Sequence, residues 1–377
     1  MVLGKSIYEL NNKLILAAGN KITPGVLKKF IERGYHYIYI EEEGTEEVIP
    51  EDIISYTVLL QASSKLEFIT KDIKLNKFRN ISVEKALKLI EEESILDTNL
   101  LFDVRNIMEE IVNDISYSAH KILNTLIPKS KSTYFVDHAI NTTILSTLIG
   151  YKYRLKKPEL LNLAIGAFLH DIGKIIVEQL IGHDDNQTFQ KLYREHSTLG
   201  YIMLRDSRAI SPMENQIVYQ HHENQGGTGF PSGLMGKNKP PTKLEVSGGK
   251  GQIFRLSEIC SVANAYDRMV LNPYDKEQLT PRGVIKKLIS MAGSYFNKDI
   301  VRTLFQIVSI YPVGVYVKVV KCDNSSLINY YGVIAEVNED NLNKPVIILI
   351  INNKLKRINP IKIDTSRLEN VKLELIL

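Results

Sequence analysis

The feature of this 377-residue sequence that most constrains its fold is the heptapeptide Phe168–Lys174, which reads FLHDIGK. It continues an apolar stretch of helical period that begins near Leu160, so His170 and Asp171 emerge from a surface that should otherwise be buried. An ionisable pair is costly to bury unless other groups or a metal ion compensate it. We therefore expect a helical core built around a polar site at this point.

A second polar stretch, Gln220–Pro231, reads QHHENQGGTGFP and places His221 and His222 next to each other, followed by Glu223. Its glycines and its proline do not allow a helix to continue. We therefore expect the two histidines at the end of a helix and the rest of the stretch in a loop.

Five histidines and one aspartate from four segments are the candidate metal ligands: His138, His170, Asp171, His196, His221 and His222. Taken alone, His138 would more often be a core histidine, but the density of imidazoles indicates metal. As neighbours on one helix, His170 and Asp171 should flank two metals, with the carboxylate bridging both. Lys174, four residues after His170, should return to the His170 face and offer an ammonium to a phosphate oxygen.

The ligand set also predicts the type of metal and the reaction. Nitrogen-rich coordination favours two divalent transition ions, iron or manganese, over magnesium, and zinc also fits. Two such ions can activate a bridging hydroxide and hold a phosphodiester in line with it. The predicted chemistry is hydrolysis at phosphorus.

Charge and cysteine content narrow the partners and the compartment. The net charge of +4 arises from 47 basic and 43 acidic residues without a basic cluster interleaved with aromatics, so a nucleic acid polymer is not an expected partner. Cys260 and Cys322 are far apart, which fits a reducing compartment. The chain start lacks a signal-peptide pattern, and we expect no apolar segment to approach the eighteen residues of a membrane span. A cytoplasmic protein is predicted.

The predicted fold class is mainly α, with small units at both ends. Four regions are expected: a small α/β unit at 1–55, a helical linker or support region at 56–126, the helical site domain at 127–311, and a β-rich unit at 312–377. In the second region, Ala86–Ile95 carries a heptad-like pattern that could pair with a second copy of the chain, although core packing is the preferred interpretation.

The two ends carry local patterns of their own. Ser6–Leu10 and Lys13–Ala17 predict a hairpin, and Thr23-Pro24 predicts the start of a helix over Gly25–Arg33. A tyrosine-rich strand should follow, in which His36 is expected to be structural. Three apolar runs after Gly314 predict a small sheet or barrel, with the basic NNKLKRINPIK segment as a solvated edge.

The order of the site residues resembles that of the HD-GYP family within the HD phosphohydrolase superfamily. The resemblance rests on His138, then His170-Asp171 with Gly173-Lys174, then His196, then His221-His222-Glu223 with GGTGFP. It covers about Thr133 to Tyr311. It implies an HD-type helical bundle with a GYP extension, and an enzyme that hydrolyses cyclic di-GMP to pGpG or GMP.

The resemblance also implies roles for individual residues. The five histidines and Asp171 match metal-ligand positions, Lys174 matches the phosphate-contacting lysine, and Asp171 with Lys174 is expected to be catalytic. Asn264 stands where the family has a ligating aspartate and should supply a neutral oxygen, with Asp267 as a possible substitute. Substrate contacts are expected from Lys174, Gly227, Gly229, Phe230, Pro231 and Arg255.

Several positions depart from the pattern of the family. Tyr134 occupies the place of a glutamate found in members with three metals, so two metals are expected. Phe230 lacks the tyrosine hydroxyl of the GYP loop, and Asn272 replaces an arginine. A catalytically degenerate module that binds a cyclic dinucleotide or a protein is therefore the alternative function. Cyclic di-GMP, a diguanylate cyclase or another signalling protein, and a second copy of the chain are the candidate partners.

Overall fold

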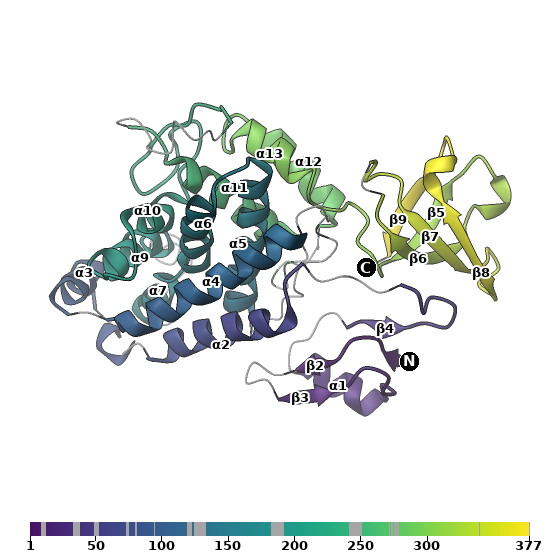
Figure 1. The fold of residues 1–377 in the computed structure, drawn as a ribbon, viewed down its shortest axis with the longest axis horizontal. Coiled ribbons are helices and arrows are strands. Elements are labelled where there is room, and N and C mark those ends of the chain that lie inside the picture. Colours follow the sequence, from purple (N-terminus) through teal and green to yellow (C-terminus); the bar gives the residue numbers. More distant parts are fainter. Residues whose placement is uncertain are drawn as a thin grey trace.

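The computed structural model describes residues 1–8, 13–32, 38–48, 53–72, 75–79, 81–93, 95–118, 123, 133–181, 192–240, 251–270, 272, 274, 279–338 and 340–376. A helical body forms the larger part of the molecule, and a small mixed unit and a β-sheet lie at its side (Figure 1). The prediction of a mainly α protein with small units at both termini is confirmed.

The helical body consists of elements that share one continuous hydrophobic core. They are α2 (Tyr56–Asp72), the 3-10 helix η1 (Leu75–Phe78), α3 (Val83–Glu92), α4 (Thr98–Ser118), α5 (Tyr134–Lys152), α6 (Lys157–Leu169), α7 (Lys174–Ile181), α9 (His196–Arg205), α10 (Pro212–Gln220), α11 (Arg255–Met269), α12 (Pro281–Met291) and α13 (Lys298–Leu304). Helix α5 is buried continuously from Val136 to Gly150 and packs against α2, α4, α6, α11 and α13. A helix buried on all sides forms the centre of a bundle.

Helix α3 settles the question of the heptad-like pattern in Ala86–Ile95. Ala86 and Ile90 are buried within the core of the same chain, and α3 packs against α9. The preferred interpretation of this pattern, core packing, is therefore confirmed.

The apolar segment Lys157–Leu180 corrects the prediction that no stretch approaches the length of a membrane span. It is 24 residues long, with a mean hydropathy of 1.6 in its most apolar window, but 83% of that window is buried inside the protein. The segment is divided between α6 and α7 by a turn at residues 170–173. The apolar composition of this segment is therefore that of helices buried in the core of the bundle.

The N-terminal unit has the predicted hairpin, because β2 (Ile7–Tyr8) pairs antiparallel with β3 (Leu14–Leu16). Strand β1 (Val2–Leu3) pairs with β4 (Ile40–Glu41). Helix α1 (Pro24–Glu32) begins at the proline, and the Thr23 hydroxyl accepts a hydrogen bond from the Val26 amide at 3.3 Å. The prediction for His36 lies outside the described residues.

The C-terminal unit is a five-stranded antiparallel sheet in the order β8-β7-β6-β5-β9. Its strands are β5 (Tyr316–Lys321), β6 (Tyr331–Glu336), β7 (Val346–Ile351), β8 (Arg357–Asp364) and β9 (Lys372–Ile376). The three predicted apolar runs form its three inner strands, and the basic segment forms the edge strand β8, as predicted. The other edge strand, β9, was not predicted.

The two ends of the chain meet at strand β8. The Arg357 guanidinium lies 2.5 Å from a carboxylate oxygen of Glu42 and donates to the Glu43 carbonyl at 2.8 Å. Lys362 Nζ lies 3.4 Å from a carboxylate oxygen of Glu47. The acidic stretch after β4 thus lies along the basic edge strand and pairs with its charged side chains, while most of the strand stays exposed.

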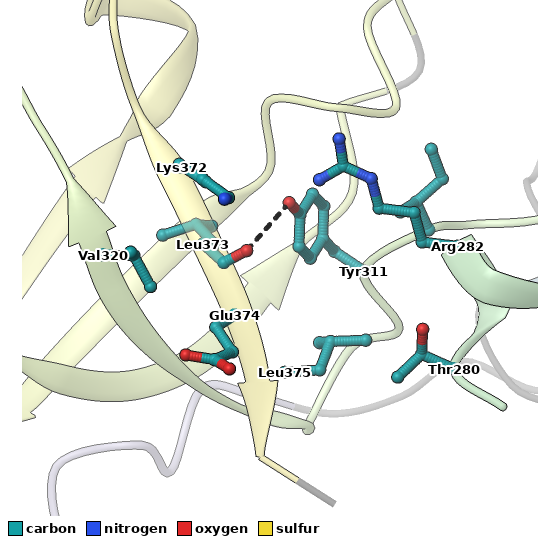
Figure 2. A pocket seen from close by; sticks show the side chains of 9 residues that line it. Thr280, Arg282, Tyr311, Val320, Lys372, Leu373, Glu374 and Leu375 are labelled. Carbon is teal, nitrogen blue, oxygen red and sulfur yellow. Dashed lines mark hydrogen bonds between the residues drawn. The ribbon is translucent and has the colours of Figure 1, made fainter. Parts of the chain in front are cut away.

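A cavity of about 390 Å³ lies between the start of α12 and the C-terminal sheet (Figure 2). Arg282 and Lys372 reach toward it from opposite walls, and the Tyr311 hydroxyl donates to the Leu373 carbonyl at 3.4 Å. None of the candidate metal ligands lines this cavity.

Candidate metal centre

The candidate ligands come together as two groups that share one carboxylate. One group is His138, His170 and Asp171, and the other is Asp171, His196, His221 and His222. Within each group the potential ligand atoms all lie within 4.8 Å of one another. Residues from four separate segments are therefore placed where each group could hold one ion.

Four of the five histidines lie at or beside helix ends. His196 is the first residue of α9, His170 is the C-cap of α6, and His221 is the C-cap of α10 and directly precedes His222. The prediction that His170 and Asp171 lie together within a helix is wrong, because Asp171 lies in the turn between α6 and α7. In that turn the carboxylate is directed toward both groups.

Hydrogen bonds at Nδ1 fix the orientation of these rings. In three of the histidines, Nδ1 contacts the carbonyl oxygen of the residue three positions earlier: His170 to Ala167 at 2.7 Å, His196 to Tyr193 at 2.5 Å and His221 to Val218 at 2.8 Å. A carbonyl can only accept, so each Nδ1 carries the hydrogen and each Nε2 keeps its lone pair for a ligand.

His138 is oriented by a carboxylate instead. Its Nδ1 lies 2.6 Å from Oδ2 of Asp267, which is a residue of α11. This contact is the carboxylate–histidine pairing that fixes the tautomer of metal-binding histidines. Asp267, considered as a substitute ligand, thus has an oxygen engaged in positioning His138.

The two oxygens of Asp171 face different groups. Oδ2 lies 3.3 Å from His170 Nε2 and 3.5 Å from His138 Nε2. Oδ1 lies 3.3 Å from His196 Nε2 and 3.6 Å from His221 Nε2. A carboxylate placed in this way can bridge two ions.

The protonation states suit metal binding. Burial lowers the pKa of His138 to about 4 and that of His221 to about 3, so both rings are neutral near pH 7. Burial alone would raise the pKa of Asp171, but its interactions with His170, Lys174 and His196 hold it well below its usual range. The site therefore offers one ionised carboxylate together with the neutral imidazoles of His138 and His221.

Two buried polar atoms support the fit of metal to this site. His222 Nε2 and Asn264 Oδ1 are both buried without a hydrogen-bond partner among the described residues. Such atoms are costly to bury unless a ligand compensates them. The set of imidazole nitrogens and one shared carboxylate matches divalent transition metals, and these residues fit the ions that the sequence predicts.

Lys174 begins α7, and its ammonium pairs with Asp171 Oδ2. The predicted return of Lys174 to the His170 face is therefore wrong, because the turn places Asp171, three residues earlier, next to it. Lys174 Nζ also lies 5.0 Å from the centre of the Tyr193 ring. The ammonium of Lys174 therefore lies between the Asp171 carboxylate and the Tyr193 ring.

The glycine-rich loop packs against the adjacent histidines. The Phe230 ring stacks on His222 at 4.5 Å between centroids, and its amide donates to the His222 carbonyl at 3.2 Å. A Cβ on Gly229 would lie 2.5 Å from that same carbonyl oxygen, so this close approach requires glycine. Glu223 accepts hydrogen bonds from the Ser232 and Leu234 amides at 2.6 and 2.8 Å. In this structure the loop holds His222 in place.

The other predicted substrate-binding residues have different surroundings. Gly227 adopts a φ of 75° and donates from its amide to the Asn224 carbonyl at 3.0 Å, and Pro231 follows Phe230 through a cis peptide bond. Arg255 is buried and donates to the carbonyls of Lys239 and Pro240. It lies nine residues before Asn264 on α11, a separation of about 14 Å along a helix. Arg255 thus holds the carbonyls of Lys239 and Pro240 in this structure, and its contact with substrate stays a prediction.

Two residues that depart from the family pattern, Asn264 and Asn272, lie on α11 and directly after it. Asn264 lies three residues before Asp267, the residue of α11 that contacts His138, so helix geometry places the two side chains on neighbouring positions of one face. The Asn272 side-chain amide donates to the Arg268 carbonyl at 3.0 Å, and its oxygen accepts from the Tyr274 amide at 3.0 Å. Asn272 therefore closes the end of α11.

Aromatic and basic residues that the sequence analysis did not single out surround the two groups. The Tyr193 ring lies near Lys174, and the Arg268 guanidinium carbon lies 5.9 Å from the centre of the same ring. The guanidinium carbon of Arg194 lies 4.9 Å from the Phe230 ring. Their only sequence signal was proximity to a candidate ligand.

Comparisons with known proteins agree with this site. Residues 121–243 match the family model of the HD domain. A cyclic di-GMP phosphodiesterase of Pseudomonas aeruginosa is 26% identical over 216 residues, 55% of this chain and 49% of that protein. Cyclic di-GMP phosphodiesterase PdeB of Borreliella burgdorferi is 26% identical over 230 residues, 60% of this chain and 55% of that protein. The chain thus matches about half the length of these relatives.

Among solved structures, an HDG"Y"P protein of Bdellovibrio bacteriovorus is 17% identical, with 81% of this chain and 94% of that chain covered and a TM-score of 0.46. The family-model match includes all five clustered histidines, Asp171 and Lys174. Through residues 121–243 the chain therefore carries an HD domain, and it is similar to proteins that are named cyclic di-GMP phosphodiesterases.

Proposed function

We propose that this chain is a metal-dependent phosphodiesterase that hydrolyses cyclic dinucleotides, with cyclic di-GMP as substrate and pGpG or GMP as product. The observation that carries the proposal is Asp171, whose two oxygens each face a separate group of imidazole Nε2 atoms. The curated relatives named cyclic di-GMP phosphodiesterases match the same part of the chain and support the substrate class.

Two divalent ions, iron or manganese, would supply a water of lowered pKa and neutralise phosphate charge. The residues that would hold them are His138, His170, Asp171, His196, His221 and His222, with Asn264 as a neutral oxygen donor. Asp267 keeps His138 in the ligand tautomer, and Phe230 keeps His222 in place. Lys174 is the residue that exchanges its ion pair with Asp171 for a contact with a phosphate oxygen.

The alternative is a relative that binds a cyclic dinucleotide or a partner protein without turnover. Asn264 is the observation that favours it, because a neutral amide replaces a charged ligand and weakens metal retention. Against it stand five clustered histidines, four of which are buried and oriented at Nδ1. A module that only binds has no need of such a set, so we favour the enzyme.

The proposal includes a cytoplasmic location, where both buried cysteines stay reduced. A diguanylate cyclase or another signalling protein, or a second copy of the chain, would be its macromolecular partner. Domain limits at 55, 126 and 311 also belong to the proposal.

The decisive experiment combines metal analysis with product chromatography. Protein purified without oxygen, with iron or manganese supplied, should contain about two ions per chain and convert cyclic di-GMP to pGpG or GMP. Replacing His170 and Asp171 together by Ala should remove the ions and the hydrolysis with the fold kept. The matched control is Asp103→Asn, an α4 carboxylate paired with Lys65 at 2.7 Å.

Each failure has a separate meaning. Metal without any hydrolysis of cyclic di-GMP would support the binding module. A double variant that hydrolyses at the parent rate would place the chemistry elsewhere.

A further inference from the structure

Arg268 forms a second cationic position beside the metal-binding groups. It lies in the last turn of α11, one residue after Asp267, and its side chain is exposed. Its guanidinium carbon lies 5.9 Å from the Tyr193 ring centre, and Lys174 Nζ lies 5.0 Å from that centre. Two cations from different helices thus approach one aromatic ring at the edge of the centre.

These two cations supply the positive charge that an anionic ligand at this edge would meet. Lys174 also pairs with the shared carboxylate of Asp171, and the Arg268 side chain is exposed beside the same Tyr193 ring. An anion that carries two negative charges could therefore interact favourably with both positions.

The end of α11 holds the backbone of Arg268 in place. Asn272 donates to the Arg268 carbonyl at 3.0 Å and positions the Tyr274 amide. The Tyr274 ring packs edge-on against Tyr134 at 5.2 Å, and Tyr134 in turn stacks on His138 at 5.6 Å. The base of Arg268 is thus tied to the wall of the metal centre while its guanidinium remains at the rim.

We propose that Arg268 binds the second phosphate of a cyclic dinucleotide, the one that is not being hydrolysed, while Lys174 contacts the phosphate held at Asp171. The inference rests on the proposed function and adds to it a residue that positions the substrate. A cyclic dinucleotide carries its two phosphodiesters in one ring, so a phosphate at the centre brings the other to the rim. A planar guanidinium can hold two of its oxygens at once.

The test compares Arg268→Gln with Arg268→Lys and with the control Arg302→Gln, an exposed arginine on α13. Arg268→Gln should raise the KM for cyclic di-GMP about tenfold or more, the loss expected for a charged hydrogen bond, and change kcat less than threefold. Binding of cyclic di-GMP to metal-stripped protein, measured by calorimetry, should weaken by a similar factor. Arg268→Lys should recover part of both losses.

A substrate with one phosphate separates binding from structural effects. Hydrolysis of bis(p-nitrophenyl) phosphate and the metal content should stay within twofold of the parent in Arg268→Gln. Equal loss on both substrates, or an unchanged KM and affinity for cyclic di-GMP, overturns the role of Arg268 and leaves the proposed function standing. A parent protein that neither binds nor hydrolyses cyclic dinucleotides overturns both.

Discussion

Gly173 leaves no room for a Cβ between the turn of Asp171 and α9, and its replacement by Ala tests how the two groups are held together. Gly173 lies in the turn after Asp171, and a Cβ built on it would lie 2.0 Å from the His196 carbonyl oxygen and 2.6 Å from the Gly200 amide nitrogen. Real Cβ contacts essentially never fall below 3.0 Å. The backbone of α9 would therefore have to retreat by about 1 Å.

That displacement is large for a metal site. His196 Nε2 lies 3.3 Å from Asp171 Oδ1, and ligands of one ion must keep their distances within about 0.2 Å. We expect Gly173→Ala to lose the ion held by His196, and to lower the free energy of unfolding by about 1–3 kcal/mol through overpacking. Tm should fall by about 1–4 °C, because the entropy of unfolding of a 377-residue chain is large.

The assay is metal content per chain together with calorimetric melting of the metal-stripped protein. Gly25→Ala is the matched control, because its Cβ would meet only the Thr23 hydroxyl at 4.0 Å and alanine favours helix α1. The control should keep the metal content and melt at or above the parent temperature. Parent-like metal content and Tm in Gly173→Ala would refute the argument from close packing.

Three further predictions concern other parts of the molecule. Asn264→Asp should tighten manganese binding to metal-stripped protein, because it restores a charged ligand; equal or weaker affinity in a titration would show that Asn264 does not face the ions. Arg357→Ala should change the free energy of unfolding by less than about 1 kcal/mol, since the pair with Glu42 is partly exposed, yet hydrogen exchange after β4 should speed up; unchanged exchange would contradict the docking of the chain ends. The pKa values of His138 and His221 are lowered from 6.5 to about 4 and about 3, so the unfolded chain binds more protons below about pH 6.5. Denaturant melts of metal-stripped protein should therefore show stability falling as the pH decreases from about 6.5 to about 4, and a flat profile would argue against neutral buried imidazoles.

Local chemistry made several elements predictable from the sequence. The capping box of Ser211 and Glu214 and the proline at the start of α10 define where that helix begins, and the glycine-rich loop defines that it ends before His222. The hairpin and the three inner strands of the C-terminal sheet follow from alternating and apolar runs of short range. The candidate metal ligands could also be found from the sequence, because the histidines lie close together in the chain and within short polar motifs.

Other features depend on contacts between segments far apart in the chain. His138 and Asp267 meet over a separation of 129 residues, and Arg357 meets Glu43 over 314. No local pattern encodes such pairs, so the sequence could name Asp267 as a substitute ligand but could not assign it to His138. For the same reason the sequence could not assign Arg255 to the carbonyls of Lys239 and Pro240.

The arrangement of the centre itself was decided by tertiary packing. The sequence placed His170 and Asp171 on one helix because the apolar period runs through them without a break. The close approach of Gly173 to the start of α9 requires a turn there, and this turn directs the two oxygens of Asp171 to different groups. The sequence by itself determined which side chains could bind metal and that the Asp171 carboxylate could bridge two ions, and only the packing of α6, α7 and α9 decided which histidines face each of its oxygens.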